Sequence, residues 1–149
     1  MEPSIGLLIR FVLGTMFLSA GASKLSDLGE FADAIKHYRI IPGATAGAAA
    51  RMVSVTEVAL GTVLIAGLAI PWASRVGSAL LIVFAVAMAV NLLRGRQIPC
   101  GCKRESEPIQ IRHIVRNLAA VGALYLLADL PGHPWAVDAL LEPRLLSFP

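Results

Sequence analysis

Cys100 and Cys102 are the residues of this chain best suited to chemistry. They are its only two cysteines, they flank Gly101, and they stand in a short polar stretch between two apolar segments. Thiolates are nucleophiles, redox centres and ligands of soft metals. A disulfide prefers a Cα separation of about 5.5–6 Å, which residues i and i+2 reach with backbone strain that glycine relaxes. Because a strained disulfide is easily reduced, the spacing favours a redox relay over a structural cross-link.

Two other hypotheses for the cysteine pair stay open. The same two thiolates suit Cu(I) or Hg(II), which accept low coordination by soft sulfur. A soft-metal binding or transport protein is therefore one alternative, although Met16 and Met88 are the clearest other soft ligands and methionine in a span usually serves packing. The other alternative is a non-catalytic membrane subunit that anchors a redox enzyme, in which the thiols have no role.

The composition places the pair in a membrane protein. Of the 149 residues 56% are hydrophobic and 15% are charged, whereas a soluble domain carries about 25% charged residues. The length allows one domain, residues 1–149. The net charge of +3, without a basic run interleaved with aromatic residues, argues against nucleic-acid binding. No cleaved signal peptide is expected, because the N-terminus lacks a positive region and Arg10 interrupts the first apolar run.

Four apolar segments are close to the roughly 20 residues that a bilayer-crossing helix needs. We therefore predict an all-α integral membrane four-helix bundle, in which Pro71 ends the second span and the polar loop 94–108 carries the cysteines. Alanines four residues apart predict close helix packing: Ala46 and Ala50, Ala85 and Ala89, Ala119 and Ala123. The predicted spans are residues 5–23, 45–70, 72–93 and 109–130.

A short amphipathic helix is predicted between the first two spans. Asp27 followed by Glu30 indicates its N-terminus, and Pro42-Gly43 its end. Its apolar residues recur every three or four positions, which is typical of a helix lying in the membrane interface: Leu28, Phe31, Ala32, Ile35 and Tyr38.

The distribution of positive charge predicts the orientation. Four spans put both termini on one side of the membrane and the cysteine loop on the other. Arg75 and Arg144 belong to the side of the termini, and the loop side has a larger set: Lys24, Lys36, Arg39, Arg94, Arg96, Lys103, Arg104 and Arg112. The positive-inside rule then places the loop in the cytoplasm of an inner-membrane protein. Since stable disulfides belong to oxidising compartments, a cytoplasmic pair is expected to be transient or catalytic.

Arg10 and Glu57 are predicted to form a buried ion pair. Arg10 lies fourteen residues before Lys24, and Glu57 lies thirteen residues after Ala44. At about 1.5 Å per residue, both would lie about 20 Å from the cysteine side of the membrane. Such a pair would fix helix register without taking part in chemistry.

Four polar residues nearer the cysteines are predicted to form a second site. A positive cluster near a thiol favours the thiolate, and the same groups suit an anionic head group or a quinone carbonyl. The consecutive pair Arg116-Asn117 is expected to point both side chains into the bundle, and Arg112 to reach the lipid phosphates. The pocket residues are Arg51, Asn91, Arg116 and Asn117, with Lys24, Arg112 and His113 at the rim.

A set of motifs covering about residues 5–130 resembles the MauE branch of the DoxX-like membrane proteins, the methylamine utilisation protein MauE-like family. Lys103 departs from the pattern, because members often carry an aromatic residue there. The motifs are Arg10, Ala20-Gly21-x-x-Lys24, Tyr38-x-x-x-Pro42, Glu57, Asn91-x-x-Arg94-Gly95, Cys100-Gly101-Cys102 and Arg116-Asn117.

The resemblance implies a four-helix membrane bundle that works beside thioredoxin-like proteins in disulfide formation, during maturation of the periplasmic enzyme methylamine dehydrogenase. It also implies that Cys100 and Cys102 are the redox pair, that four polar residues shape the intramembrane site (Arg10, Glu57, Arg116 and Asn117), and that some relatives are linked to quinones. The leading hypothesis is therefore an inner-membrane thiol–disulfide oxidoreductase with a thioredoxin-like partner, whose electrons leave to a quinone near Arg116.

Overall fold

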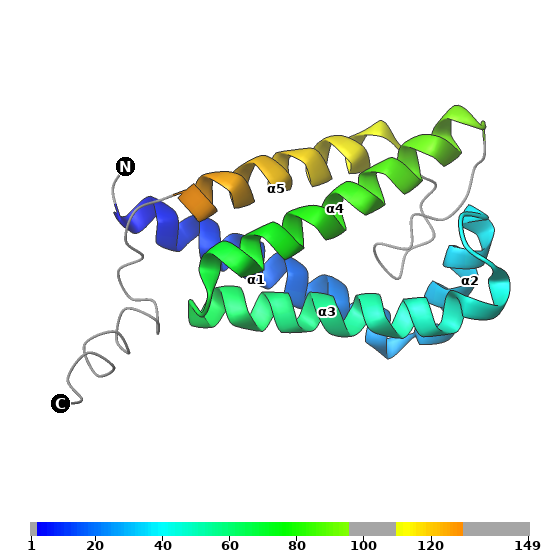
Figure 1. The fold of residues 1–149 in the computed structure, drawn as a ribbon, viewed down its shortest axis with the longest axis horizontal. Coiled ribbons are helices and arrows are strands. Elements are labelled where there is room, and N and C mark those ends of the chain that lie inside the picture. Colours follow the sequence, from blue (N-terminus) through cyan, green and yellow to red (C-terminus); the bar gives the residue numbers. More distant parts are fainter. Residues whose placement is uncertain (1–2, 96–109, 130–149) are drawn as a thin grey trace.

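The structure, a computed structural model, describes residues 3–95 and 110–129. Four long helices lie along one another in an elongated bundle, and the short helix α2 lies at one end (Figure 1). Each long helix is apolar enough and long enough to cross a membrane. The all-α membrane prediction is confirmed, and the chain is a multi-pass membrane protein. The elements are α1 (Pro3–Ser26), α2 (Leu28–Tyr38), a 3-10 turn (Gly43–Thr45), α3 (Ala46–Ala66), α4 (Ile70–Leu93) and α5 (Ile111–Asp129).

The turn between α3 and α4 comes earlier than the sequence interpretation placed it. Gly67 adopts a left-handed conformation with φ of 73°, and its N–H bonds to the carbonyls of Val63 and Leu64. This is the usual glycine cap of a helix C-terminus, which ends α3 at Ala66. Pro71 then stands in the first turn of α4, where its missing N–H costs nothing. The prediction that Pro71 ends the second span is therefore wrong.

Helix α2 is the predicted amphipathic helix. The Asp27 side chain caps it by accepting a hydrogen bond of 3.0 Å from the Glu30 N–H. Phe31 and Ala34 are buried on its inner face, which packs against α3. On the outer face Lys36 donates a hydrogen bond to Asp33, and this bond together with the Lys36 charge lowers the pKa of Asp33. The helix ends at Tyr38, four residues before the predicted Pro42.

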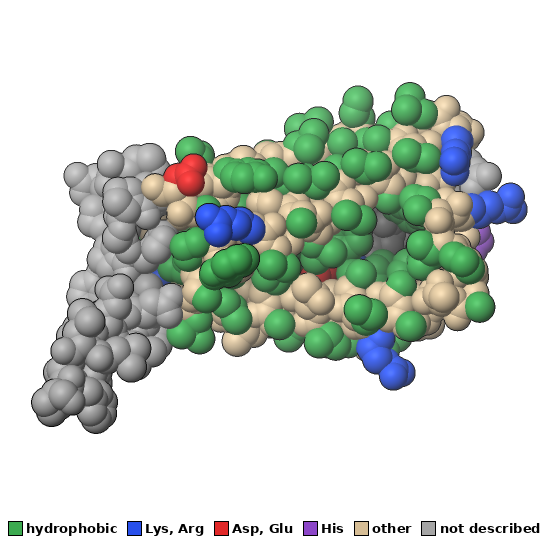
Figure 2. All heavy atoms as spheres, in the orientation of Figure 1, with side chains coloured by type: hydrophobic (Ala, Val, Ile, Leu, Met, Phe, Trp, Pro, Cys, Tyr) green, Lys and Arg blue, Asp and Glu red, His purple; other side chains and the backbone are tan. Residues whose placement is uncertain are grey.

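The four long helices are organised as two pairs. Helix α1 packs along α3, and α4 packs along α5. The pairs meet in a core of large apolar side chains that includes Phe17, Leu64, Ile70, Leu124 and Leu127. Many large apolar side chains, however, point outward, and hydrophobic groups cover the visible face of the bundle (Figure 2). Such a surface is costly in water and suits contact with lipid.

Glycines make a close contact between α1 and α3. A Cβ atom added at Gly21 would lie 2.8 Å from the Ser54 carbonyl oxygen, and one at Gly61 would lie 2.7 Å from the Gly14 carbonyl oxygen. The missing side chains let the backbones of α1 and α3 approach closely, as small residues do between membrane helices. Of the predicted alanine positions, Ala46, Ala50 and Ala85 are buried, whereas Ala119 is exposed.

Gly61→Ala is expected to lower the free energy of unfolding by about 1–3 kcal/mol, the typical cost of overpacking. The added methyl group would meet the backbone of α1, which cannot move aside as a flexible side chain does. Gly122→Ala is the control, because nothing lies within 4 Å of the added atom. Equilibrium unfolding in detergent micelles measures both variants, and equal stabilities would contradict the close contact.

Candidate functional site

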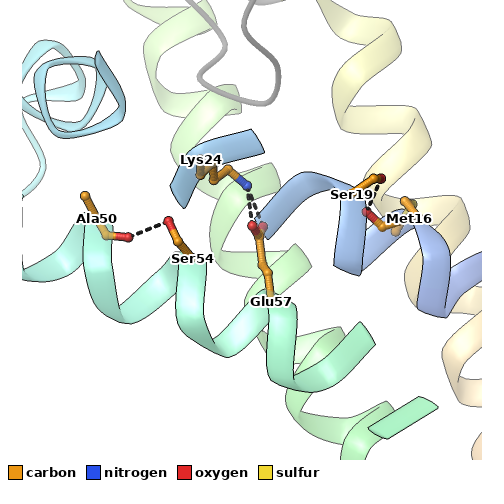
Figure 3. Close-up of polar contacts among 6 residues, drawn as sticks. All are labelled: Met16, Ser19, Lys24, Ala50, Ser54 and Glu57. Carbon is orange, nitrogen blue, oxygen red and sulfur yellow. Dashed lines mark hydrogen bonds and ion pairs between the residues drawn. The ribbon is translucent and has the colours of Figure 1, made fainter. Parts of the chain in front are cut away.

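A buried ion pair joins α1 to α3. The Lys24 Nζ donates hydrogen bonds to both carboxylate oxygens of Glu57, at 2.5 and 2.7 Å (Figure 3). Lys24 is 7% exposed and Glu57 is 2% exposed. Ionisable side chains inside a membrane bundle are costly, so a pair at this depth indicates either a fixed register or a binding site.

Glu57 pairs with Lys24, so the predicted Arg10–Glu57 ion pair is wrong. Gly21 faces Ser54 across the interface, and Gly14 faces Gly61. In this antiparallel register Arg10 is level with the C-terminal end of α3, about ten residues or 15 Å from Glu57, which exceeds the reach of an arginine. Arg10 is itself buried, with its guanidinium 5.7 Å from the centroid of the Phe11 ring.

The prediction failed because it took Lys24 to lie at the membrane surface. Helix α3 begins at Ala46, roughly two turns before the level of Lys24, and α2 folds over the same region. Lys24 is therefore an interior residue instead of the rim residue that the sequence suggested.

Two aromatic rings complete the surroundings of Lys24. Its Nζ lies 5.2 Å from the centroid of the Phe31 ring on α2 and 5.0 Å from that of the Phe84 ring on α4. Both distances suit cation–π attraction. A single ammonium group of α1 thus contacts α2, α3 and α4. The apolar periodicity of α2 indicated that Phe31 is buried, whereas nothing in the sequence singled out Phe84.

A cavity of about 170 Å³ lies beside this ammonium group. Among the lining residues that the structure describes, Lys24 is the one that is charged, and the others are apolar or aromatic. Figure 2 shows the surface hollowed between α3 and α4 near the α2 end. The walls come from α2 (Phe31, Ile35 and Tyr38), from the segment after it (Ile40 and Ile41), from α3 (Ala49 and Val53) and from α4 (Val83, Phe84, Ala87 and Met88).

The polar pocket predicted from the sequence does not form among the described residues. Arg51 and Arg116 are exposed, whereas Asn91 and Asn117 are buried, and none of the four lines the cavity. Consecutive helix residues point about 100° apart, since there are about 3.6 per turn, so Arg116 faces outward while Asn117 faces the bundle.

The other predicted polar residues lie near the α2 end of the bundle. Asn91 donates a hydrogen bond of 3.0 Å to the Ala87 carbonyl oxygen. His113 is buried and its Nδ1 accepts a hydrogen bond of 3.1 Å from the Gln110 N–H, at the start of α5. Arg112, beside it, is exposed. The Asn91 bond lies within the last two turns of α4 and the His113 bond lies at the start of α5, and neither Asn91 nor His113 lines the cavity.

Cys100 and Cys102 lie outside the described residues. The described chain stops at Gly95 and resumes at Gln110, both at the end of the bundle where α2 lies (Figure 1). Within residues 3–95 and 110–129, no three His, Cys, Asp or Glu side chains gather as a metal site would require.

Comparisons with known proteins give the family. The family model of the methylamine utilisation protein MauE matches residues 2–129. Methylamine utilization protein MauE of Paracoccus denitrificans is 35% identical over 144 residues, covering 94% of this chain and 76% of the relative. Methylamine utilization protein MauE of Paracoccus versutus is 39% identical over 143 residues, covering 88% of this chain and 75% of the relative. No solved structure matches the chain. The chain therefore belongs to the methylamine utilisation protein MauE family.

Proposed function

We propose that the chain is a membrane thiol–disulfide oxidoreductase in methylamine utilisation, which exchanges disulfides with a thioredoxin-like partner. The main support is that its only two cysteines form the Cys100-Gly101-Cys102 pair in the segment that connects α4 to α5. The described ends of that segment lie at one end of the bundle (Figure 1). The end of a membrane-spanning bundle is the part that a soluble partner can reach. The name of the family supports a role in methylamine utilisation.

The exchange passes one electron pair between the two proteins. A thiolate of the partner attacks the Cys100–Cys102 disulfide, and a mixed disulfide forms while one cysteine of this chain leaves as a thiolate. The second thiolate of the partner attacks the mixed disulfide, which leaves the partner oxidised and both cysteines of this chain reduced. A membrane quinone then accepts two electrons and two protons from the two thiols, which gives a quinol and restores the disulfide.

Basic residues near the α2 end support a reactive cysteine pair. Arg39, Arg51, Arg94 and Arg112 are exposed there, and basic side chains gather toward that end in Figure 2. Nearby positive charge favours the thiolate over the thiol. By the positive-inside rule, we place this end on the cytoplasmic side of the inner membrane. Labelling with a membrane-impermeant thiol reagent tests that orientation.

Trapping the mixed disulfide tests the proposed exchange. Cys100→Ser and Cys102→Ser each leave one thiol, which is first activated as a mixed disulfide with thionitrobenzoate. One activated variant is expected to accumulate a covalent complex with a thioredoxin-like protein that lacks its own second cysteine, because the thiolate of that protein displaces thionitrobenzoate and no second thiolate is present to reverse the bond. The complex is detected by non-reducing electrophoresis and must disappear on reduction. Full exchange activity in both single variants would rule out the relay.

A further inference from the structure

We propose that the cavity beside Lys24 binds the head group of a quinone, with the Lys24 ammonium group donating a hydrogen bond to a carbonyl oxygen. This inference rests on the proposed function, because thiol oxidation needs an electron acceptor. It assigns that acceptor a site made of Lys24, Phe31 and Phe84 instead of the pocket predicted from the sequence.

The size and walls of the cavity suit a single ring. An apolar cavity of about 150 Å³ binds benzene, and this one measures about 170 Å³. The rings of Phe31 and Phe84 and the side chain of Met88 line it, so a flat apolar ring has aromatic surfaces to contact.

Lys24 supplies a charged hydrogen-bond donor to the cavity. An ammonium group has three donors, and the two oxygens of Glu57 accept two of them. Among residues 3–95 and 110–129, the other groups near the Lys24 Nζ are the rings of Phe31 and Phe84, at 5.2 and 5.0 Å from their centroids, which attract the charge but bring no acceptor oxygen. The Lys24 side chain is almost fully buried and lines the cavity. A buried donor of this kind favours a ligand that brings an acceptor oxygen.

The charge of Glu57 selects a neutral ligand. Because the carboxylate already neutralises Lys24, a fatty acid or a phosphate head group would bring a second negative charge close to Glu57 in a medium of low dielectric constant. A positively charged ligand would be repelled by the Lys24 ammonium group for the same reason. A carbonyl oxygen accepts the hydrogen bond without either repulsion.

The outer part of the cavity opens toward the lipid-facing surface. Val83 is 61% exposed and Ile40 is 52% exposed, and both line the cavity. A molecule dissolved in the bilayer can therefore reach the cavity from the side. During reduction, the Lys24 donor would stabilise negative charge as it develops on the carbonyl oxygen.

A binding experiment with matched variants tests the site. The full chain is reconstituted in lipid nanodiscs, and saturation binding of a radiolabelled short-chain ubiquinone is measured. Ala87→Phe fills the cavity while keeping both residues of the ion pair, and it is expected to weaken binding at least about tenfold. Ala79→Phe is the control, because Ala79 is an exposed residue of α4 outside the lining, and it should bind as the natural chain does.

The donor is tested by Lys24→Met combined with Glu57→Met, which leaves no unpaired charge. Loss of a charged donor is expected to weaken quinone binding by about 10-fold to 100-fold. A photoreactive azidoquinone should attach to α2 and α4. The site would be overturned if the natural chain did not bind the quinone, or if Ala87→Phe and Ala79→Phe bound it equally well. Attachment of the azidoquinone to helices other than α2 and α4 would overturn it as well.

Disulfide exchange by the natural chain, measured without quinone, separates the two proposals. Exchange without quinone binding would leave the proposed function standing and overturn the quinone site. Quinone binding at the cavity without exchange would contradict the proposed function.

Discussion

Lys24→Met alone is expected to destabilise the folded bundle by about 3–5 kcal/mol, the cost of leaving a buried charge without its partner. The substitution keeps an apolar side chain of similar length but leaves the Glu57 carboxylate 2% exposed with no counter-charge from Lys24. Equilibrium unfolding in detergent micelles gives the free energy directly.

The double variant Lys24→Met with Glu57→Met separates charge pairing from packing. Replacing both members of a buried ion pair by apolar residues is often neutral, so this variant should recover most of the lost stability. Lys36→Met is the exposed control, because it removes an ion pair whose side chains are more than half exposed and should cost no more than about 1 kcal/mol. A Lys24→Met variant as stable as Lys36→Met would contradict the buried pair.

Cys100→Ser combined with Cys102→Ser is expected to abolish catalysed disulfide exchange. Removing a catalytic nucleophile costs about a thousandfold or more in rate, and this double variant removes both cysteine sulfur atoms of the chain. The measurement is the rate at which a thioredoxin-like partner is oxidised or reduced by the reconstituted protein.

Lys103→Ser is the matched control, since it changes the same loop and keeps both cysteines. It should retain most of the exchange rate. Unchanged exchange in the double cysteine variant would contradict the relay, and loss of bound Cu(I) in the same variant would then favour the soft-metal alternative.

Most of the fold follows from the sequence. The lengths of the four apolar segments predict four membrane-spanning helices. The helical spacing of Leu28, Phe31 and Ile35, together with the cap residue Asp27, predicts α2. The Gly67 cap was a readable signal for the end of α3. Pro71 misled the prediction because a proline occurs both after a helix and in the first turn of the next one.

The site could not be predicted as well, because it depends on contacts between helices. The pairing of Glu57 depends on the register of α1 against α3, which the contacts of Gly14, Gly21 and Gly61 determine. Counting residues from a loop does not give that register. Phe84 lies in a stretch of α4, residues 79–90, in which every residue is apolar, so no pattern separates it from its lipid-facing neighbours. The opposite directions of Arg116 and Asn117, by contrast, follow from helix geometry alone.

Thiol labelling tests the cysteine relay most directly. Cells producing the protein are treated with a membrane-impermeant maleimide, intact or opened, and the purified membrane protein, with Cys100 and Cys102 in the disulfide form, is labelled before and after incubation with a reduced thioredoxin-like partner. We expect no labelling of the disulfide, labelling of both Cys100 and Cys102 once the reduced partner has transferred its electron pair to them, and labelling in cells only after opening. Cysteines that never react with the reagent, or that stay in the disulfide form after incubation with the reduced partner, would contradict the relay.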